Sequence, residues 1–208
     1  KFVELLSYNI MSFGNMKKEN GQNPILNYIK NSKADIVCMQ EYAGSETAKI
    51  HLNKKEIRQA LKDYPYRHIK QVGKTGAGSQ IACYSKFPIL SARMLDYQSN
   101  YNGSMVYDIK IGKDTVLLIN NHLESNKLTR EDKVVYEDML KDPKAGKVKS
   151  GIRQLVNKLA EASAIRSAQA RAIAQEIARS PYPSVIVCGD FNDSPISYAH
   201  RVISQDLD

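Results

Sequence analysis

Oxygen-bearing side chains gather where one strongly apolar run of this sequence ends. The run SVIVC, residues 184–188, is followed at once by Gly189, Asp190, Phe191 and Asn192. Asp190 and Asn192 are two positions apart, so along an extended chain their side chains face the same side. A carboxylate there can act on water while an amide donates to a phosphate oxygen, and phosphoryl transfer needs little beyond such positioning and charge neutralisation. We therefore treat Asp190 and Asn192 as candidate catalytic residues.

Three further apolar runs end in, or carry, a polar residue that could bind a metal ion or a phosphate group. Asn9 closes FVELLSYN, Glu41 follows ADIVCMQ, and His122 ends DTVLLINNH. In open α/β architectures the strand ends present side chains to a crevice. Mg²⁺ needs oxygen ligands, keeps several waters and takes only one or two carboxylates from a protein, and Glu41 with Asn9 beside it would supply that sparse set. His122 could donate a hydrogen bond to a non-bridging phosphate oxygen.

Each residue also has an interpretation without function. Asn9 could cap a turn, Glu41 could be a surface carboxylate, and His122 could be a structural histidine with satisfied hydrogen bonds. Asp193 is interpreted as the cap of the turn that follows it and stands outside the candidate site. One such residue would mean little, whereas four apolar runs with the same feature favour a site.

The elements that must position these residues alternate along the chain. Apolar patterns predict strands within 2–10, 34–40, 80–90, 105–111, 114–125 and 184–189, and helices from Pro24 with Asn23 as N-cap, over 47–61 and over 151–179. The turn at 111–114 is typical of a hairpin, so the sheet arrangement is mixed and not wholly parallel. The basic stretch 141–150 is interpreted as a solvated loop, with a phosphate clamp as the alternative. The glycine-rich stretch 73–80 lacks the order of a nucleotide-binding P-loop.

Length and composition limit the possible classes. A chain of 208 residues that is 42% hydrophobic can bury one sizeable core, and we expect one domain over 1–208. The net charge of +8 favours a polyanionic partner, with simple solubility as the alternative. Each of the three cysteines lies in an apolar run and is expected to pack as a small hydrophobe, which fits a reducing compartment. No apolar run is long enough to span a membrane, and no signal peptide is recognisable.

In chain order, the motifs SYN, QE, YSKFPI, NHLES and GDFNDSP resemble the endonuclease/exonuclease/phosphatase superfamily. This resemblance implies an α/β (α+β) fold of the deoxyribonuclease I type, a four-layer sandwich of two mixed β-sheets flanked by helices. It implies that Asn9 and Glu41 form the metal site, with Mg²⁺ or Mn²⁺ as the ion. Asp190 would orient or deprotonate the attacking water, Asn192 would contact the scissile phosphate, and His122 would bond a phosphate oxygen. Asn121 stands where many relatives carry threonine.

One departure from the family lies at the end of the chain. Relatives have a further aspartate and then an Asp-His pair in their last strands, whereas this sequence ends at SQDLD. His200 follows the GDFN turn too closely to substitute for that pair and is expected on a helix. We expect that the chain is an excised piece that lacks the C-terminal strands, since it also begins at Lys1 without methionine; the alternative is a domain that cannot complete the reaction.

The leading hypothesis is a Mg²⁺-dependent phosphoric ester hydrolase in which water attacks phosphorus in line. Its substrate is a phosphodiester or phosphomonoester, and the positive charge favours nucleic acid. A phospholipid- or inositol phosphate-directed hydrolase and a catalytically silent binding module are the alternatives. We expect a monomer. Because some bacterial relatives carry membrane helices before this domain, both a bacterial cytoplasmic location and membrane anchoring of the full-length protein stay open.

Overall fold

The computed structural model describes residues 2–14, 21–44, 52–73, 80–97, 99–141 and 146–207. In chain order its elements are β1 (Leu5–Asn9), the 3-10 turn η1 (Met11–Phe13), α1 (Pro24–Ser32), β2 (Ile36–Tyr42), α2 (Lys54–Ala60), β3 (Tyr66–Gln71), β4 (Gln80–Ser85), β5 (Ile89–Met94), β6 (Gly103–Ile111), β7 (Asp114–His122), α3 (Arg130–Lys141), α4 (Gly146–Ala178), β8 (Ser184–Asp190) and α5 (Tyr198–Ser204). Strands and helices alternate near the two ends of the chain, whereas β3 to β7 follow one another in the middle, where the sequence predicts a hairpin.

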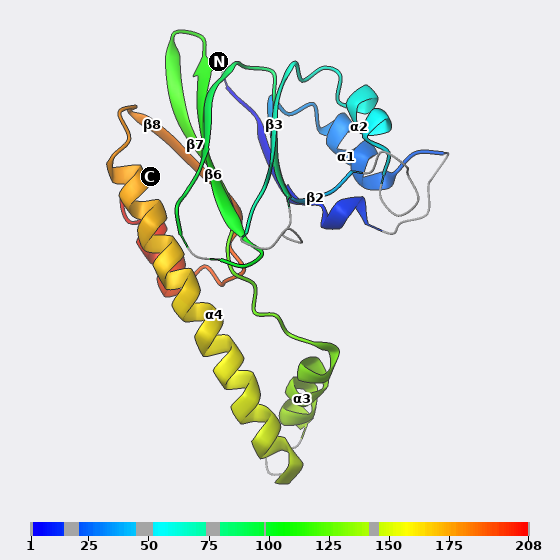
Figure 1. Ribbon diagram of the computed structural model, residues 1–208, viewed down its shortest axis with the longest axis vertical. Helices are drawn as coiled ribbons and strands as arrows, with labels where there is room; N and C mark the ends of the chain where they lie inside the picture. Colours follow the sequence, from blue (N-terminus) through cyan, green and yellow to red (C-terminus); the bar gives the residue numbers. More distant parts are fainter. Residues whose placement is uncertain are drawn as a thin grey trace.

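The strands form two mixed four-stranded sheets (Figure 1). The first has the order β1-β2-β4-β3, in which β1 and β2 are parallel and the other pairs antiparallel. The second has the order β5-β6-β7-β8, in which β7 and β8 are parallel and the other pairs antiparallel. β1 and β8 therefore lie at corresponding edges of the two sheets, and these two strands contact each other.

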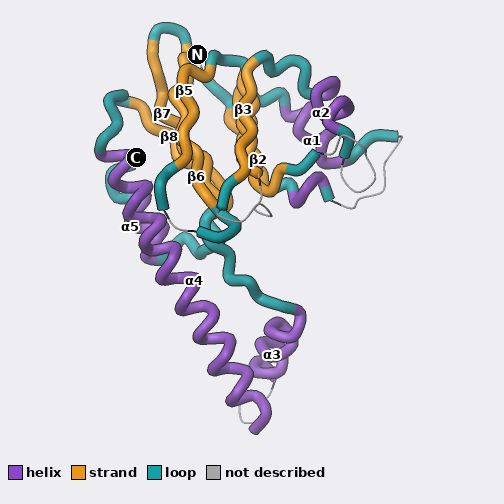
Figure 2. The backbone as a smooth tube through the Cα atoms, viewed as in Figure 1, coloured by secondary structure: helices purple, strands orange, loops and turns teal. Residues whose placement is uncertain are grey.

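Three apolar clusters hold the layers together. The cluster between the sheets includes Ile36, Tyr107 and Leu118 and is completely or almost completely buried. A second cluster packs α1 and α2 against the first sheet, for example through Ile29 and Ile57. A third packs α4 and α5 against the second sheet (Figure 2). The chain therefore has the layer order helix, sheet, sheet, helix, in agreement with the expected sandwich.

Local sequence signals explain several boundaries. Asn23 caps α1 by accepting a hydrogen bond from the backbone N–H of Leu26 at 3.0 Å, and Pro24 occupies the first helical position. The expected helix over 47–61 begins only at Lys54, because Asn53 serves as its N-cap; residues 47–51 of that prediction lie outside the described residues. The expected single strand over 80–90 is two strands in different sheets, separated by a short turn that contains Pro88, which cannot donate to a strand ladder.

Two elements, β3 and α3, are not predicted from the sequence because they lack an apolar pattern. β3 is a mostly exposed edge strand whose sequence YRHIKQ has no apolar run. α3 lies within a polar segment for which no element is predicted.

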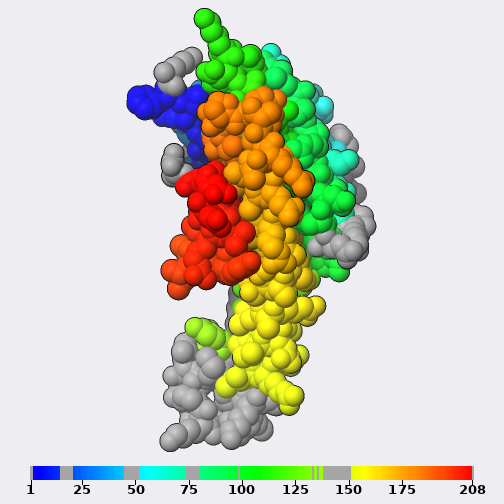
Figure 3. Space-filling model, turned by 90° about the vertical axis from the view of Figure 1, so that its left-hand side faces the viewer, coloured from blue at the N-terminus to red at the C-terminus, as the bar shows by residue number. Residues whose placement is uncertain are grey.

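α4 begins at Gly146, inside the predicted basic loop, and its 33 residues correspond to about 50 Å of helix. Its N-terminal part and α3 pack together and extend beyond the sheets (Figure 1), and Figure 3 shows α4, in yellow, continuing past the sheets.

Candidate active site at the junction of the two sheets

All five predicted site residues come from strand ends on one side of the molecule. Asn9 ends β1, and Glu41 is the penultimate residue of β2, the neighbouring parallel strand. His122 and Asp190 end β7 and β8 and are register partners, and Asn192 follows two residues after Asp190. Because β1–β2 and β7–β8 are parallel pairs, each pair delivers its C-terminal residues to one edge of its sheet.

The side chain of Asn9 joins the two sheets. Its Nδ2 donates to Glu41 Oε1 at 3.0 Å and to Asp190 Oδ2 at 2.8 Å. Its Oδ1 accepts from the backbone N–H of Met11 at 3.1 Å, which fixes the amide group. Two carboxylates from strands far apart in the sequence therefore lie against one amide nitrogen. This contact brings the predicted metal residues and the predicted catalytic aspartate into one cluster.

His122 lies beside the same carboxylate. Its Nε2 is 3.7 Å from Glu41 Oε1, and only 6% of its side chain is exposed. Burial lowers the pKa of His122 below its ordinary value, although the negative charges of Asp190, Glu41 and Glu124 partly oppose this change. The imidazole is therefore neutral near pH 7 and has one N–H to donate.

The backbone after β8 places Asn192. Asp190 Oδ1 accepts from the backbone N–H of Asn192 at 2.9 Å, and Asn192 Nδ2 donates to the carbonyl oxygen of Leu123 at 2.9 Å. Both Asn192 and Glu41 have a φ of 51°, in the left-handed region that residues other than glycine rarely adopt. At Glu41 the strand also shifts register between Met39 and Tyr42. Such backbone strain concentrates at functional sites.

The donor set fits a hard divalent cation. Glu41 has 38% of its side chain exposed, and its second oxygen, Oε2, has no hydrogen-bond partner among the described residues. No cluster of three or more acidic, histidine or cysteine side chains suited to a metal ion occurs in the described ranges. Mg²⁺ takes only one or two carboxylates from a protein and keeps several waters, and the partly exposed carboxylate of Glu41 beside the Asn9 amide fits this requirement.

Beneath the site, buried polar residues that are not among the five predicted site residues support it. Gln40 donates to Asn120 Oδ1 at 2.6 Å, which links β2 to β7 across the sheet interface. Arg166 of α4, also buried, donates from Nε to Asp193 Oδ2 at 3.0 Å. The sequence does carry a signal for Arg166. It lies four residues after Ala162 in the apolar stripe of the predicted helix, where a charge is unexpected.

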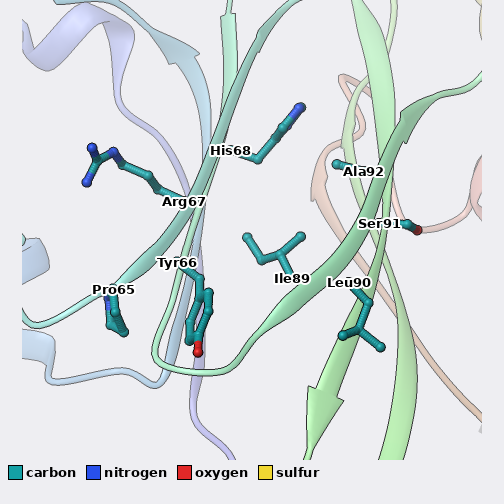
Figure 4. Close-up of a pocket in the computed structure, with 8 residues that line it drawn as sticks. All are labelled: Pro65, Tyr66, Arg67, His68, Ile89, Leu90, Ser91 and Ala92. Atoms are coloured by element: carbon teal, nitrogen blue, oxygen red, sulfur yellow. The ribbon is translucent and has the colours of Figure 1, made fainter.

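A shallow groove of about 460 Å³ lies elsewhere, between the edge strands β3 and β5 (Figure 4). In Figure 4, His68 and Ile89 point into the gap between the strands, whereas Arg67 points away from it. None of the five predicted site residues lines this groove. It is therefore separate from the candidate site.

A model of the Endonuclease/Exonuclease/phosphatase family matches residues 6–207. The chain belongs to this family. The match includes all five predicted residues and explains why the motifs occur in this order. No curated protein sequence gives a significant match.

Solved structures of similar fold include a sphingomyelinase and a TDP2 enzyme. Beta toxin from Staphylococcus aureus is 16% identical with a TM-score of 0.59, and the match covers 99% of this chain and 71% of the toxin. Sphingomyelinase C from Streptomyces griseocarneus is 18% identical with a TM-score of 0.59, and 98% and 69% of the two chains are covered. TDP2 from D. rerio, humanized by 14 mutations, is 15% identical with a TM-score of 0.58, and 92% and 67% are covered. At these identities the likeness shows the fold, which is that of the phosphoesterases of this family.

Proposed function

We propose that the protein is a divalent-metal-dependent phosphoester hydrolase in which an activated water attacks phosphorus in line. The observation that carries this proposal is the pair of hydrogen bonds from Asn9 Nδ2. This nitrogen donates to Glu41 Oε1 of one sheet at 3.0 Å and to Asp190 Oδ2 of the other at 2.8 Å. Two carboxylates that share one amide group are close enough to act on the same phosphate, one by holding a metal ion and the other by orienting water.

Glu41 would hold the metal ion, with the oxygen of Asn9 as a second ligand. Mg²⁺ is the ion that this sparse oxygen set favours, and Mn²⁺ has similar requirements. A bound divalent ion would neutralise negative charge on the phosphate. The second oxygen of Glu41, which has no hydrogen-bond partner among the described residues, is available for this role.

The remaining residues would act directly on water and phosphate. Asp190 accepts hydrogen bonds through both oxygens, so its carboxylate is held in one orientation from which it can orient or deprotonate water. One N–H of the Asn192 amide is bonded to Leu123, and the amide has a second N–H that can donate to a phosphate oxygen. Neutral His122 can donate another hydrogen bond to that phosphate as charge develops.

Nucleic acid is the substrate class that the net charge of +8 favours, because phosphate backbones are attracted to basic proteins. A phospholipid substrate is the second candidate. Two large apolar side chains in the segments after Asn9 and Asn192 are strongly exposed, Met11 at 68% and Ile196 at 87%. Exposed aliphatic groups beside a site suit a lipid surface better than base stacking.

The test is a substrate panel with the intact protein. Duplex and single-stranded DNA, RNA, sphingomyelin vesicles and inositol polyphosphates are incubated with Mg²⁺, with Mn²⁺ and with EDTA. The expected result is hydrolysis of at least one phosphodiester that EDTA abolishes and Mg²⁺ restores, with DNA or RNA preferred. Binding of a substrate without any hydrolysis would support the silent binding module, and hydrolysis unaffected by EDTA would contradict the metal-dependent mechanism.

A further inference from the structure

Arg166 is a buried cation that bonds two separate segments of the chain. It lies on α4 and is only 4% exposed. Its Nε donates to Asp193 Oδ2 at 3.0 Å, and its Nη1 donates to the carbonyl oxygen of Glu124 at 2.9 Å and to Asn126 Oδ1 at 2.8 Å. The planar guanidinium thus bonds one carboxylate and two neutral oxygens, which offsets the cost of burying its charge.

The two segments that Arg166 joins are those that follow His122 and Asp190. They also bond each other directly. The backbone N–H of Leu123 donates to the carbonyl oxygen of Asp190 at 2.9 Å, and Asn192 donates from its side chain to the carbonyl oxygen of Leu123. A displacement of either segment would therefore change the position of the Asn192 amide.

Helix α4 gives this contact a rigid base. Gln169, three residues after Arg166 and fully buried, accepts from the backbone N–H of Glu124 at 2.9 Å. Ala170 and Ile173, on the same part of the helix, belong to the apolar cluster against the second sheet. Side chains at steps of three and four residues share a helix face, so Arg166 and Gln169 reach the same loop together.

We propose that Arg166 is a positioning residue that sets the placement of the 122–126 segment relative to the 190–193 segment, and thereby the alignment of His122, Asp190 and Asn192. The proposal rests on the proposed function for its catalytic consequence. Its structural content, the coupling of two loops through one guanidinium, does not depend on the reaction.

Lysine cannot replace the fork of the guanidinium, because a single ammonium group cannot bond Asp193 and the 124–126 loop in the same geometry. Arg166→Lys keeps the charge and is the main variant, and Arg166→Met removes the charge as well. Arg171→Met is the matched control, since Arg171 lies on the same helix and is exposed. The kinetic assay uses a phosphodiester that the wild-type protein hydrolyses. On this substrate Arg166→Lys should lower kcat by about 100-fold, because small misplacements of catalytic groups are costly. The KM should change by less than about threefold. The affinity for Mn²⁺, measured by electron paramagnetic resonance, should stay unchanged because the hydrogen bonds of Arg166 go to Asp193, Glu124 and Asn126.

Hydrogen–deuterium exchange tests the coupling without activity. The reporting amides are those of Leu123, Glu124 and Asn192, whose acceptors lie in the joined segments or on α4. Arg166→Lys should raise the exchange rates in both segments together by about tenfold or more, whereas Arg171→Met should not. Unchanged exchange, or faster exchange in one segment alone, would overturn the proposal, as would wild-type kcat in Arg166→Lys. If the wild-type protein hydrolyses no phosphoester, the proposed function fails while the exchange experiment still decides the role of Arg166.

Discussion

Asp190 is held through both carboxylate oxygens, since one accepts from Asn9 at the end of β1 and the other from the backbone N–H of Asn192 in the turn after β8. Removal of its charge should therefore affect the activation of water more than the binding of substrate. We expect Asp190→Asn to lower kcat by about 1,000-fold, within the usual contribution of a general base, with KM nearly unchanged. Steady-state kinetics on the best substrate of the panel measure both constants. Equal losses in kcat and in substrate affinity would contradict a role on water.

His122 should make stability depend on pH. Burial lowers its pKa in the folded protein below the ordinary value of 6.5, so between the two pKa values the unfolded chain binds more protons than the folded one. The free energy of unfolding should therefore rise with pH through this window. Above about pH 6.5 His122 is neutral in both states, so it causes no further rise. His68 has a pKa lowered by burial as well and contributes in the same direction.

Urea denaturation between pH 5 and 7.5 measures this effect, with EDTA present so that no bound metal changes the charge beside His122. His122→Gln should show a weaker loss of stability on acidification than the wild type, and His68→Gln serves as the comparison for a histidine away from the site. If His122→Gln kept the full pH dependence of the wild type, the histidine would not be held neutral by the fold.

At the scale of elements, the pairing of β7 with β8 depends on Gly189. Its φ of +134° is unusual for an L side chain, and a Cβ there would lie 2.1 Å from the backbone oxygen of Asn121, its register partner. Gly189→Ala should destabilise the protein by about 3 kcal/mol or more and displace Asp190. Gly112→Ala is the control, because Gly112 also has a positive φ, of +63°, but no atom lies within 4 Å of its added Cβ.

Thermal and chemical denaturation of the two variants separate the steric clash from the backbone strain. Gly112→Ala should lose only the cost of a left-handed alanine, about 1–2 kcal/mol. If Gly189→Ala were no less stable than Gly112→Ala, the close approach of β8 to β7 would not be essential.

The elements that the sequence predicts well are those whose apolar pattern reflects burial. Continuous apolar runs predict β2, β7 and β8, and the polar ends of these strands are neighbours in space. β3 and α3 cannot be recognised in this way, because both carry many charged residues and most of the side chains described in them are exposed, so packing gives them no pattern. The pairing of distant groups is also beyond sequence prediction. Asp193 is expected only to cap a turn, yet it both accepts from Ser194 and binds Arg166.

At the scale of the whole molecule, the excess of positive charge makes a prediction that separates nucleic acid from other substrates. If DNA or RNA is the substrate, its KM should rise by at least about tenfold between 50 and 200 mM salt, because binding releases counterions from the phosphate backbone. A small monoanionic diester should show little change. The comparison is made at constant Mg²⁺, and a KM for nucleic acid that does not depend on salt would contradict electrostatic binding.

None of the helices in the described part of the chain is long and apolar enough to cross a membrane.

The arrangement that matters for function is the meeting of two sheets at the ends of β1 and β8. The fold supplies the rigid strands, and the amide of Asn9 donates to both the Glu41 and the Asp190 carboxylates and so holds them together. Metal dependence should therefore rest on the carboxylate of Glu41.

The most direct measurement is the rate of hydrolysis of bis(p-nitrophenyl) phosphate over a Mg²⁺ titration, for the wild-type protein and for Glu41→Gln. Glutamine keeps the size and the hydrogen-bonding oxygen that faces Asn9 but removes the charge that would hold the ion. The wild-type rate should rise to saturation with Mg²⁺, and the variant should be slower by more than about 100-fold while it unfolds at a similar temperature. A folded Glu41→Gln protein with the wild-type rate and the same Mg²⁺ dependence would contradict the account.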